Sequence, residues 1–249
     1  MLSPNGLTMT PNKVQIIQDW PEPHKVKDIQ SFLGFANFYH CFIYKYSRIN
    51  STLMHLTCKN LPWNFTDECH STFNALKKAF TTTPVLTHWM PDTQITVETD
   101  TTNYALAAIL SITTPSGKLH PIAFHSQTFK TPECNYNVHD KELLMIVEAF
   151  TCWRHYLEGS GTPINVVADH RNLQYFSTTK ILTRQQACWL EFLSAFNLVI
   201  CFHPRSLERN LTLLLDNRMS ILEENSDFPY SGWSSLHYFP MLQKASFSG

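Results

Sequence analysis

Residues 94–112, QITVETDTTNYALAAILSI, contain two strand-like segments from which the fold class can be predicted. Apolar and polar residues alternate from Ile95 to Thr99, which is the period of a half-buried β-strand. After a short polar break, a second apolar run covers Ala105 to Ile112, and a third covers Leu119 to Phe124. Three such runs close together predict an antiparallel meander.

The segments on either side of this meander predict the rest of the fold. Downstream we expect a helix over about 138–156, a strand over 163–168, short helices near Asn172 and over 184–196, and a last strand over 198–203. Strands followed by alternating strand and helix predict an α/β fold, in which helices flank a mixed sheet. Upstream, prolines separate three helical segments, 11–20, 26–42 and 68–80.

Composition limits the class of protein. Nineteen Lys and Arg against 20 Asp and Glu give a net charge of −1, so contact with a nucleic acid would depend on local patches. The seven cysteines are scattered without a Cys-x-x-Cys spacing, which predicts a reduced intracellular compartment and no structural zinc. The start of the chain lacks the pattern of a secretory signal, and no apolar run reaches membrane-spanning length, so we expect no membrane partner.

Three acidic residues are the candidate functional residues. Asp100 and Asp169 each end an apolar run of strand type, and Glu142 lies early in the helix predicted over 138–156. Two neighbouring strands and a helix packed on them could bring these carboxylates together, and such a set binds hard cations, typically Mg²⁺. An isolated aspartate at a strand end is more often a turn or cap residue, and Glu142 by itself would be a solvated helix residue.

Several motifs, in one order along the chain, resemble the polyprotein of gypsy-type LTR retrotransposons, especially its fungal members. They are KVQIIQDWP at 13–21, QSFLGFANFY at 30–39, PVL at 84–86, ETD at 98–100, NYNVHDKEL at 135–143 and WRHYLEG at 153–159. The resemblance covers residues 1–217. It implies a small helical thumb and connection fragment of reverse transcriptase over 1–90, followed by an RNase H-like domain over 91–217 with a five-stranded mixed sheet flanked by helices. Residues 218–249 are an unassigned tail.

The resemblance also implies a reaction, which is hydrolysis of the RNA strand of an RNA–DNA hybrid with Mg²⁺, or Mn²⁺ in its place. Asp100 would bridge two metal ions, and Glu142 and Asp169 would each hold one. The family has a fourth aspartate in its last helix, and counting from Pro204 places Thr212 at that position. Asp216 lies one turn farther along and would replace it only if the helix slid. A missing ligand predicts impaired catalysis.

Two hypotheses about function remain open. The first is an enzyme, a member of the RNA-directed DNA polymerase family that lacks the polymerase palm, since no Tyr-x-Asp-Asp turn occurs in this chain. Its partners would be an RNA–DNA hybrid and other parts of a retrotransposon polyprotein. The second is an inactive remnant that folds and at most binds nucleic acid weakly. Five positions where the family tends to have arginine favour the remnant: His40, Cys41, Gln127, Cys188 and His203.

Overall fold

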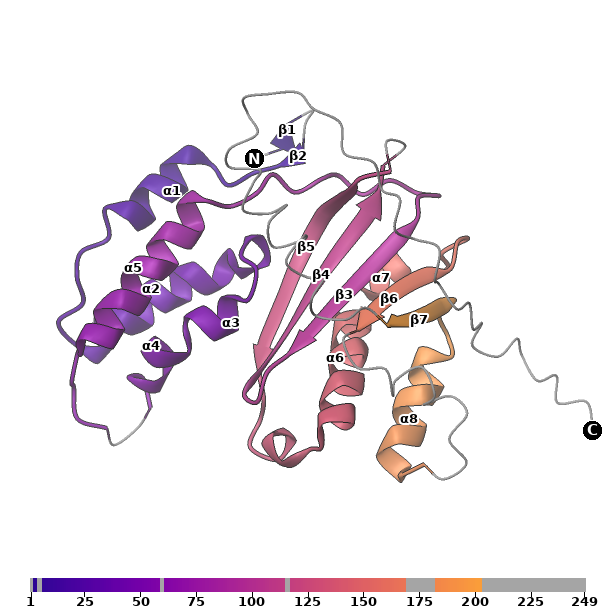
Figure 1. Ribbon diagram of the computed structural model, residues 1–249. Coiled ribbons are helices and arrows are strands. Elements are labelled where there is room, and N and C mark those ends of the chain that lie inside the picture. The colour runs from indigo at the N-terminus through magenta and orange to yellow at the C-terminus, as the bar shows by residue number, and fades with distance from the viewer. Residues whose placement is uncertain (1, 4–5, 59–60, 115–116, 169–181, 203–249) are drawn as a thin grey trace, which may run out of the picture.

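The computed structural model describes residues 2–3, 6–58, 61–114, 117–168 and 182–202 (Figure 1). The chain first forms a helical region and then a sheet with helices packed on it. The helical region contains α1 (Pro11–Gln18), α2 (Val26–Phe38), the 3₁₀ helix η1 (His40–Phe42), α3 (Tyr46–Ile49), α4 (Ser51–His55) and α5 (Asp67–Thr81). A two-stranded antiparallel pair, β1 (Leu2–Ser3) and β2 (Gly6–Leu7), precedes it.

The central sheet has five strands in the order β5-β4-β3-β6-β7. Its members are β3 (Ile95–Thr101), β4 (Ala105–Thr113), β5 (Leu119–Thr128), β6 (Ile164–Ala168) and β7 (Leu198–Phe202). The first three strands pair antiparallel, as the meander pattern predicts, whereas β6 joins β3 in parallel and β7 joins β6 in parallel. The prediction of a mixed five-stranded sheet is therefore confirmed.

Helices cover one face of this sheet and form the first of two apolar cores. After the 3₁₀ helix η2 (Glu133–Asn135), α6 (Val138–Cys152) crosses behind β3, and α7 (Arg154–Leu157) and α8 (Arg184–Leu193) follow (Figure 1). Val97, Leu110 and Val166, which are neighbours across three strands, lie with α6 in this core and are fully buried.

Local sequence signals fix where the two long helices of the sheet region begin. The Asn137 side chain caps α6 by accepting the backbone N–H of Asp140 at 2.8 Å. Thr183 and Gln186 form a reciprocal capping box at the start of α8. Each cap satisfies an N–H group that the first helical turn cannot pair internally.

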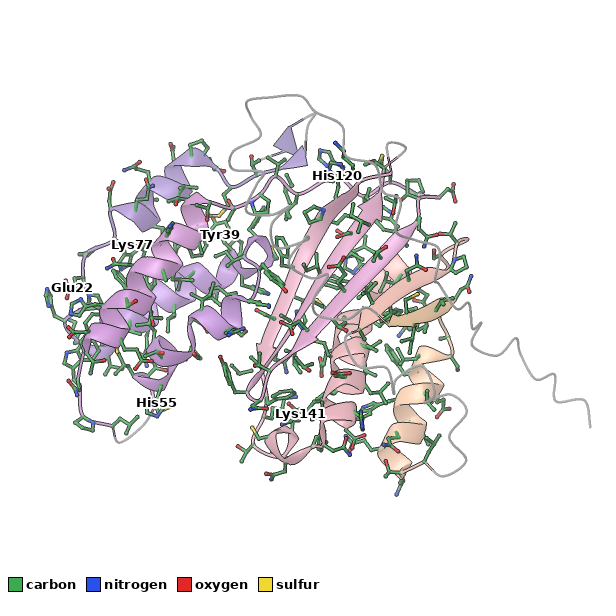
Figure 2. The ribbon with its side chains drawn as sticks, viewed as in Figure 1. Glu22, Tyr39, His55, Lys77, His120 and Lys141 are labelled. Atoms are coloured by element: carbon green, nitrogen blue, oxygen red, sulfur yellow. The ribbon has the colours of Figure 1, made fainter. Side chains whose placement is uncertain are left out.

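The helical region forms the second core and shares it with the sheet. Most of its buried members come from α1, α2, α3, α4 and α5, and Ile109 of β4 and Phe124 of β5 join it from the sheet face that α6 does not cover. The Lys77 amino group of α5 donates to the carbonyl oxygens of Gln18 and Trp20, which joins α5 to the end of α1 (Figure 2). The two regions are thus packed against each other through side chains.

A close backbone contact joins the start of the chain to the end of the helical region. Leu7 and Leu86 exchange two backbone hydrogen bonds, of 2.7 and 3.0 Å. Gly6 has a φ of 135°, and a Cβ there would lie 2.3 Å from the Leu86 carbonyl oxygen. Glycine is required at this position because a side chain meets both a strained backbone and a clash.

Several element boundaries differ from those predicted. Strand β5 continues to Thr128 rather than ending at Phe124, because it keeps pairing with β4 through its polar residues. The helix predicted over 138–156 is divided at Trp153, between α6 and α7. The short helices α3 and α4 were not predicted. The helix expected near Asn172, residue 203 of the last strand and the 218–249 tail lie outside the described residues.

Within the described ranges, no helix is both long and apolar enough to cross a membrane. The division at residue 90 stays a prediction, and the shared core shows that the regions on its two sides are in direct contact.

Candidate active site

Asp100 lies near the end of β3, the central strand of the sheet. Its direct neighbour on β4 is Ala107, and the neighbour of Ala107 on β5 is Ser126. Residues opposite one another across strands share a face, so these three side chains form one row. The next row along the strands is Glu98, Ile109 and Phe124, which includes the two sheet residues of the second core. Asp100 therefore faces the helical region.

Asp100 forms an ion pair with a lysine in the part of the chain that the structure describes. The Lys45 ammonium nitrogen lies 2.5 Å from Oδ2 of Asp100, and the two side chains are 25% and 12% exposed. Lys45 immediately precedes α3 and has a φ of 55°, in the left-handed region. This contact crosses from the helical region to the sheet, and nothing in the sequence pattern around Lys45 predicted it.

Glu142 lies in the second turn of α6 and is 2% exposed. Both of its carboxylate oxygens are buried. The alternative of a solvated helix residue is therefore wrong for Glu142, because a glutamate is almost never buried this completely unless it is paired. The buried carboxylate is the strongest local indication that this position serves more than solubility.

Asp169 and Thr212 lie outside the described residues, as does Asp216. The position of Asp169 in the sequence can be compared with the pairing of β3 and β6. Strands β3 and β6 pair in parallel, with Glu98 opposite Val167. Asp100 is two residues beyond Glu98, and Asp169 is two residues beyond Val167.

In the described part of the chain, no three His, Cys, Asp or Glu side chains are grouped as a metal-binding cluster. The carboxylates of Asp100 and Glu142 are of the type that hard divalent cations prefer. Among the described residues, the ammonium of Lys45 forms an ion pair with Asp100. The donor chemistry thus fits Mg²⁺, but Asp100 faces the helical region whereas Glu142 belongs to α6 on the other face of the sheet, so their role as ligands of one site stays a prediction.

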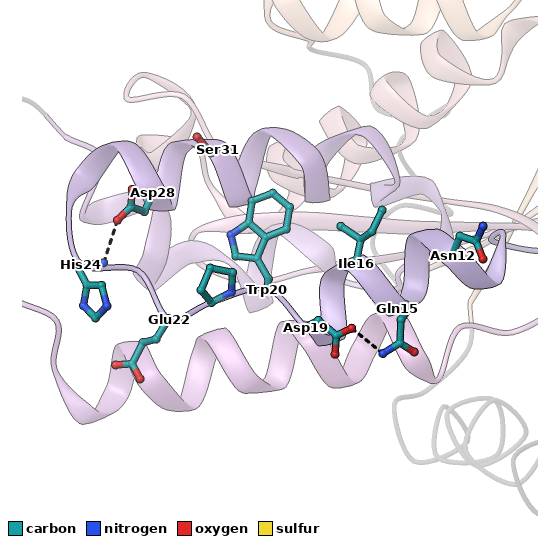
Figure 3. Close-up of a pocket in the computed structure, with 10 residues that line it drawn as sticks. Asn12, Gln15, Ile16, Asp19, Trp20, Glu22, His24, Asp28 and Ser31 are labelled. Carbon is teal, nitrogen blue, oxygen red and sulfur yellow. Dashed lines mark hydrogen bonds between the residues drawn. The ribbon is translucent and has the colours of Figure 1, made fainter.

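An open pocket of about 810 Å³ lies elsewhere, between α1 and the start of α2 (Figure 3). Its carboxylates take part in local contacts: Asp19 accepts from the Gln15 side chain at 2.8 Å, and Asp28 accepts the His24 N–H at 3.1 Å. Glu22 lies 3.1 Å from Nδ1 of His70. Three acidic groups around one pocket disfavour a phosphate backbone, so we do not place a hybrid there.

Comparison with known proteins gives the family of the chain. Residues 65–166 match the model for the RNase H-like domain found in reverse transcriptase. The Tf2-3 and Tf2-4 transposon polyproteins of Schizosaccharomyces pombe are 30% identical to this chain over 230 residues, which is 92% of the chain. The chain belongs to the gypsy-type retrotransposon polyprotein family. It spans only 17% of the length of these polyproteins.

Solved structures agree with this family at the level of the fold. The foamy viral protease-reverse transcriptase dRH in complex with double-stranded DNA matches with a TM-score of 0.66, over 80% of this chain and 35% of that one. The foamy viral protease-reverse transcriptase in complex with an RNA/DNA hybrid matches with a TM-score of 0.65, over 80% and 27%. Both are 21% identical to the retrotransposon chain. The RNase H-like fold predicted from the sequence is confirmed.

Proposed function

We propose that this chain is a retrotransposon-derived fragment of reverse transcriptase. Residues 1–90 form its thumb and connection part, residues 91–217 form an RNase H-like domain that hydrolyses RNA in RNA–DNA hybrids, and 218–249 are a tail without an assigned role. The observation that carries the proposal is the sheet order: β3, which contains Asp100, pairs in parallel with β6, which ends one residue before Asp169 in the sequence. The RNase H-like domain of the family and the foamy viral complex with an RNA/DNA hybrid support the substrate class.

Asp100, Glu142 and Asp169 are the residues proposed to hold Mg²⁺, or Mn²⁺ in its place. When bound, two divalent ions would activate a water and stabilise the charge on the leaving oxygen. Asp100 would supply a carboxylate from the face of β3 that the helical region covers, and Glu142 would supply one from α6, which packs on the other face of the sheet. The burial of Glu142 would keep its carboxylate in a fixed orientation.

The proposed activity is impaired because Thr212 replaces the fourth carboxylate of the family. A hydroxyl carries no negative charge to balance a divalent cation, so one metal ion is held less tightly. The alternative function is a catalytically inactive remnant that binds nucleic acid weakly. The Lys45 contact favours this alternative, since an ammonium group already neutralises Asp100.

Cleavage of a labelled RNA–DNA hybrid by the purified chain, in Mg²⁺ and in Mn²⁺, tests the proposal. We expect slow cleavage by the natural sequence, a gain of roughly tenfold or more with Thr212→Asp, and complete loss with Asp100→Asn. Asp216→Asn serves as the matched control and should leave the rate unchanged. If neither the natural sequence nor Thr212→Asp cleaves the hybrid, the remnant hypothesis is correct. Cleavage that survives Asp100→Asn would show a contaminating nuclease or another site.

A further inference from the structure

The short segment 44–47 attaches the helical region to the sheet face that contains Asp100. The Tyr44 ring lies 5.9 Å from the Phe124 ring, centroid to centroid. The Lys45 ammonium contacts Asp100, and the backbone N–H of Ser47 donates to the buried Oγ of Ser126 at 2.9 Å. Asp100 and Ser126 belong to one row across the sheet, so the segment follows that row from β3 to β5.

The backbone of Lys45 is held in an unfavourable conformation by these contacts. Its φ of 55° and ψ of 31° are in the left-handed region, which residues with a side chain other than Asn and Asp seldom adopt. Its carbonyl oxygen accepts the N–H groups of Arg48 and Ile49, which begins α3. Strain at a residue whose side chain reaches a predicted catalytic carboxylate indicates that the position of this side chain matters.

The Lys45–Asp100 pair lies in a partly buried setting. Because the Asp100 side chain is only 12% exposed, its attraction to the ammonium is less screened than that of a surface pair. A divalent cation on the same carboxylate oxygen would be repelled by an ammonium 2.5 Å away. The two cations therefore compete for this oxygen of Asp100.

We propose that Lys45 is a built-in counter-cation of Asp100, and that a divalent metal ion binds Asp100 only when the Lys45 ammonium leaves it. This inference rests on the proposed function, since that function makes Asp100 a metal ligand. The Tyr44 ring provides a place for the displaced ammonium: Lys45 Nζ already lies 4.8 Å from its centroid, within cation–π range. The lysine stem is flexible, so it can swing toward Tyr44 while Tyr44 and Ser47 keep their contacts with the sheet.

Binding of Mn²⁺ without nucleic acid, measured by titration calorimetry at fixed pH and ionic strength, tests the inference. The main variant is Lys45→Asn, because asparagine tolerates the left-handed conformation while removing the charge. Lys45→Gly is the second variant, and it removes the strain as well. Lys118→Asn changes the charge equally at an exposed lysine of the β4–β5 turn and is the matched control.

We expect Lys45→Asn and Lys45→Gly to bind Mn²⁺ about tenfold more tightly than the natural sequence. The gain should vanish in the Lys45→Asn/Asp100→Asn double variant, and Lys118→Asn should show no such gain. Equal binding by the natural sequence and both Lys45 variants, with a loss on Asp100→Asn, would overturn the role of Lys45 and leave the metal site intact. Absence of any Asp100-dependent Mn²⁺ binding in all variants would overturn both the inference and the proposed metal-dependent function.

Thermal unfolding gives a second readout that needs no binding isotherm. In EDTA, Lys45→Asn should lower the Tm because Asp100 loses its counter-charge, and Mn²⁺ should raise the Tm of this variant more than that of the natural sequence. An equal Mn²⁺ response in the two proteins would contradict the competition between the two cations.

Discussion

The helical region and the sheet region bury their apolar side chains in different ways. The sheet region buries its own strands under its own helices: α6 and α8 complete a core with β3, β4, β6 and β7. The helical region consists of short helices whose shared core includes Ile109 and Phe124 from the sheet. The sheet region completes this core with its own residues, whereas the core of the helical region includes two residues of the sheet.

This difference indicates which region depends on the other. Short helices are marginal alone, and their stability comes from the apolar surface that they bury. Removal of the sheet would uncover one side of the helical core, whereas removal of the helical region would leave α6 and its core in place. We therefore expect the sheet region to determine the stability of the whole chain, and the helical region to respond to the interface between them.

The largest expected effect comes from Phe124→Ala at this interface. Phe124 is 2% exposed, and truncation of a buried phenylalanine costs about 3–5 kcal/mol. Hydrogen exchange should accelerate mainly in α2 and α5. The matched control is Phe150→Ala in the core of the sheet region, where the residue is fully buried. That variant should accelerate exchange in both regions, and equal patterns for the two variants would contradict the dependence of the helical region on the sheet.

A smaller effect is expected from Ser126→Ala. The buried N–H of Ser47 would lose its acceptor, and an unsatisfied buried donor costs about 1–3 kcal/mol. Urea unfolding followed by circular dichroism measures the change. Ser126→Thr keeps the hydroxyl and should recover most of the stability. A fully stable Ser126→Ala protein would mean that segment 44–47 does not need this hydrogen bond to stay on the sheet.

The pH dependence of stability gives a finer test at the edge strand β5. His125 lies on the α6 face, with its ring 6.1 Å from that of Trp153, and burial together with the charge of His40 lowers its pKa below 6.5. The folded state therefore favours neutral His125, so stability is complete above pH 6.5 and falls as the pH decreases through this value. His125→Phe should flatten this part of the profile. An unchanged profile would assign the dependence to other groups.

The sequence predicted the parts of the fold that have a regular period. Alternation revealed β3, although the strand continues two residues beyond Thr99 because Asp100 and Thr101 still pair with β4. The caps and apolar faces of α6 and α8 are also local signals. By contrast, α3 and α4 have no period to detect, since four or five residues complete little more than one turn.

The residue types of the candidate site stay a prediction from the sequence, and their surroundings could be predicted only in part. The position of Asp100 near a strand end could be read from the apolar run before it. The contact with Lys45 could not, because it depends on a left-handed backbone at Lys45 and on the packing of Tyr44 against Phe124. Both are consequences of tertiary structure. Glu142 was predicted as a metal ligand, and its burial follows from the packing of α6 on β3.

A double-mutant cycle on Lys45 and Asp100 tests most directly the central claim that the helical region reaches the predicted catalytic carboxylate. Unfolding free energies of the natural sequence, Lys45→Asn, Asp100→Asn and the double variant would be measured in EDTA, so that no metal ion contributes. We predict a coupling energy of about 1 kcal/mol, within the range for contacting residues, because each single variant removes one member of the same ion pair. Strictly additive effects would contradict the contact and, with it, the role of Lys45 as the counter-cation of Asp100.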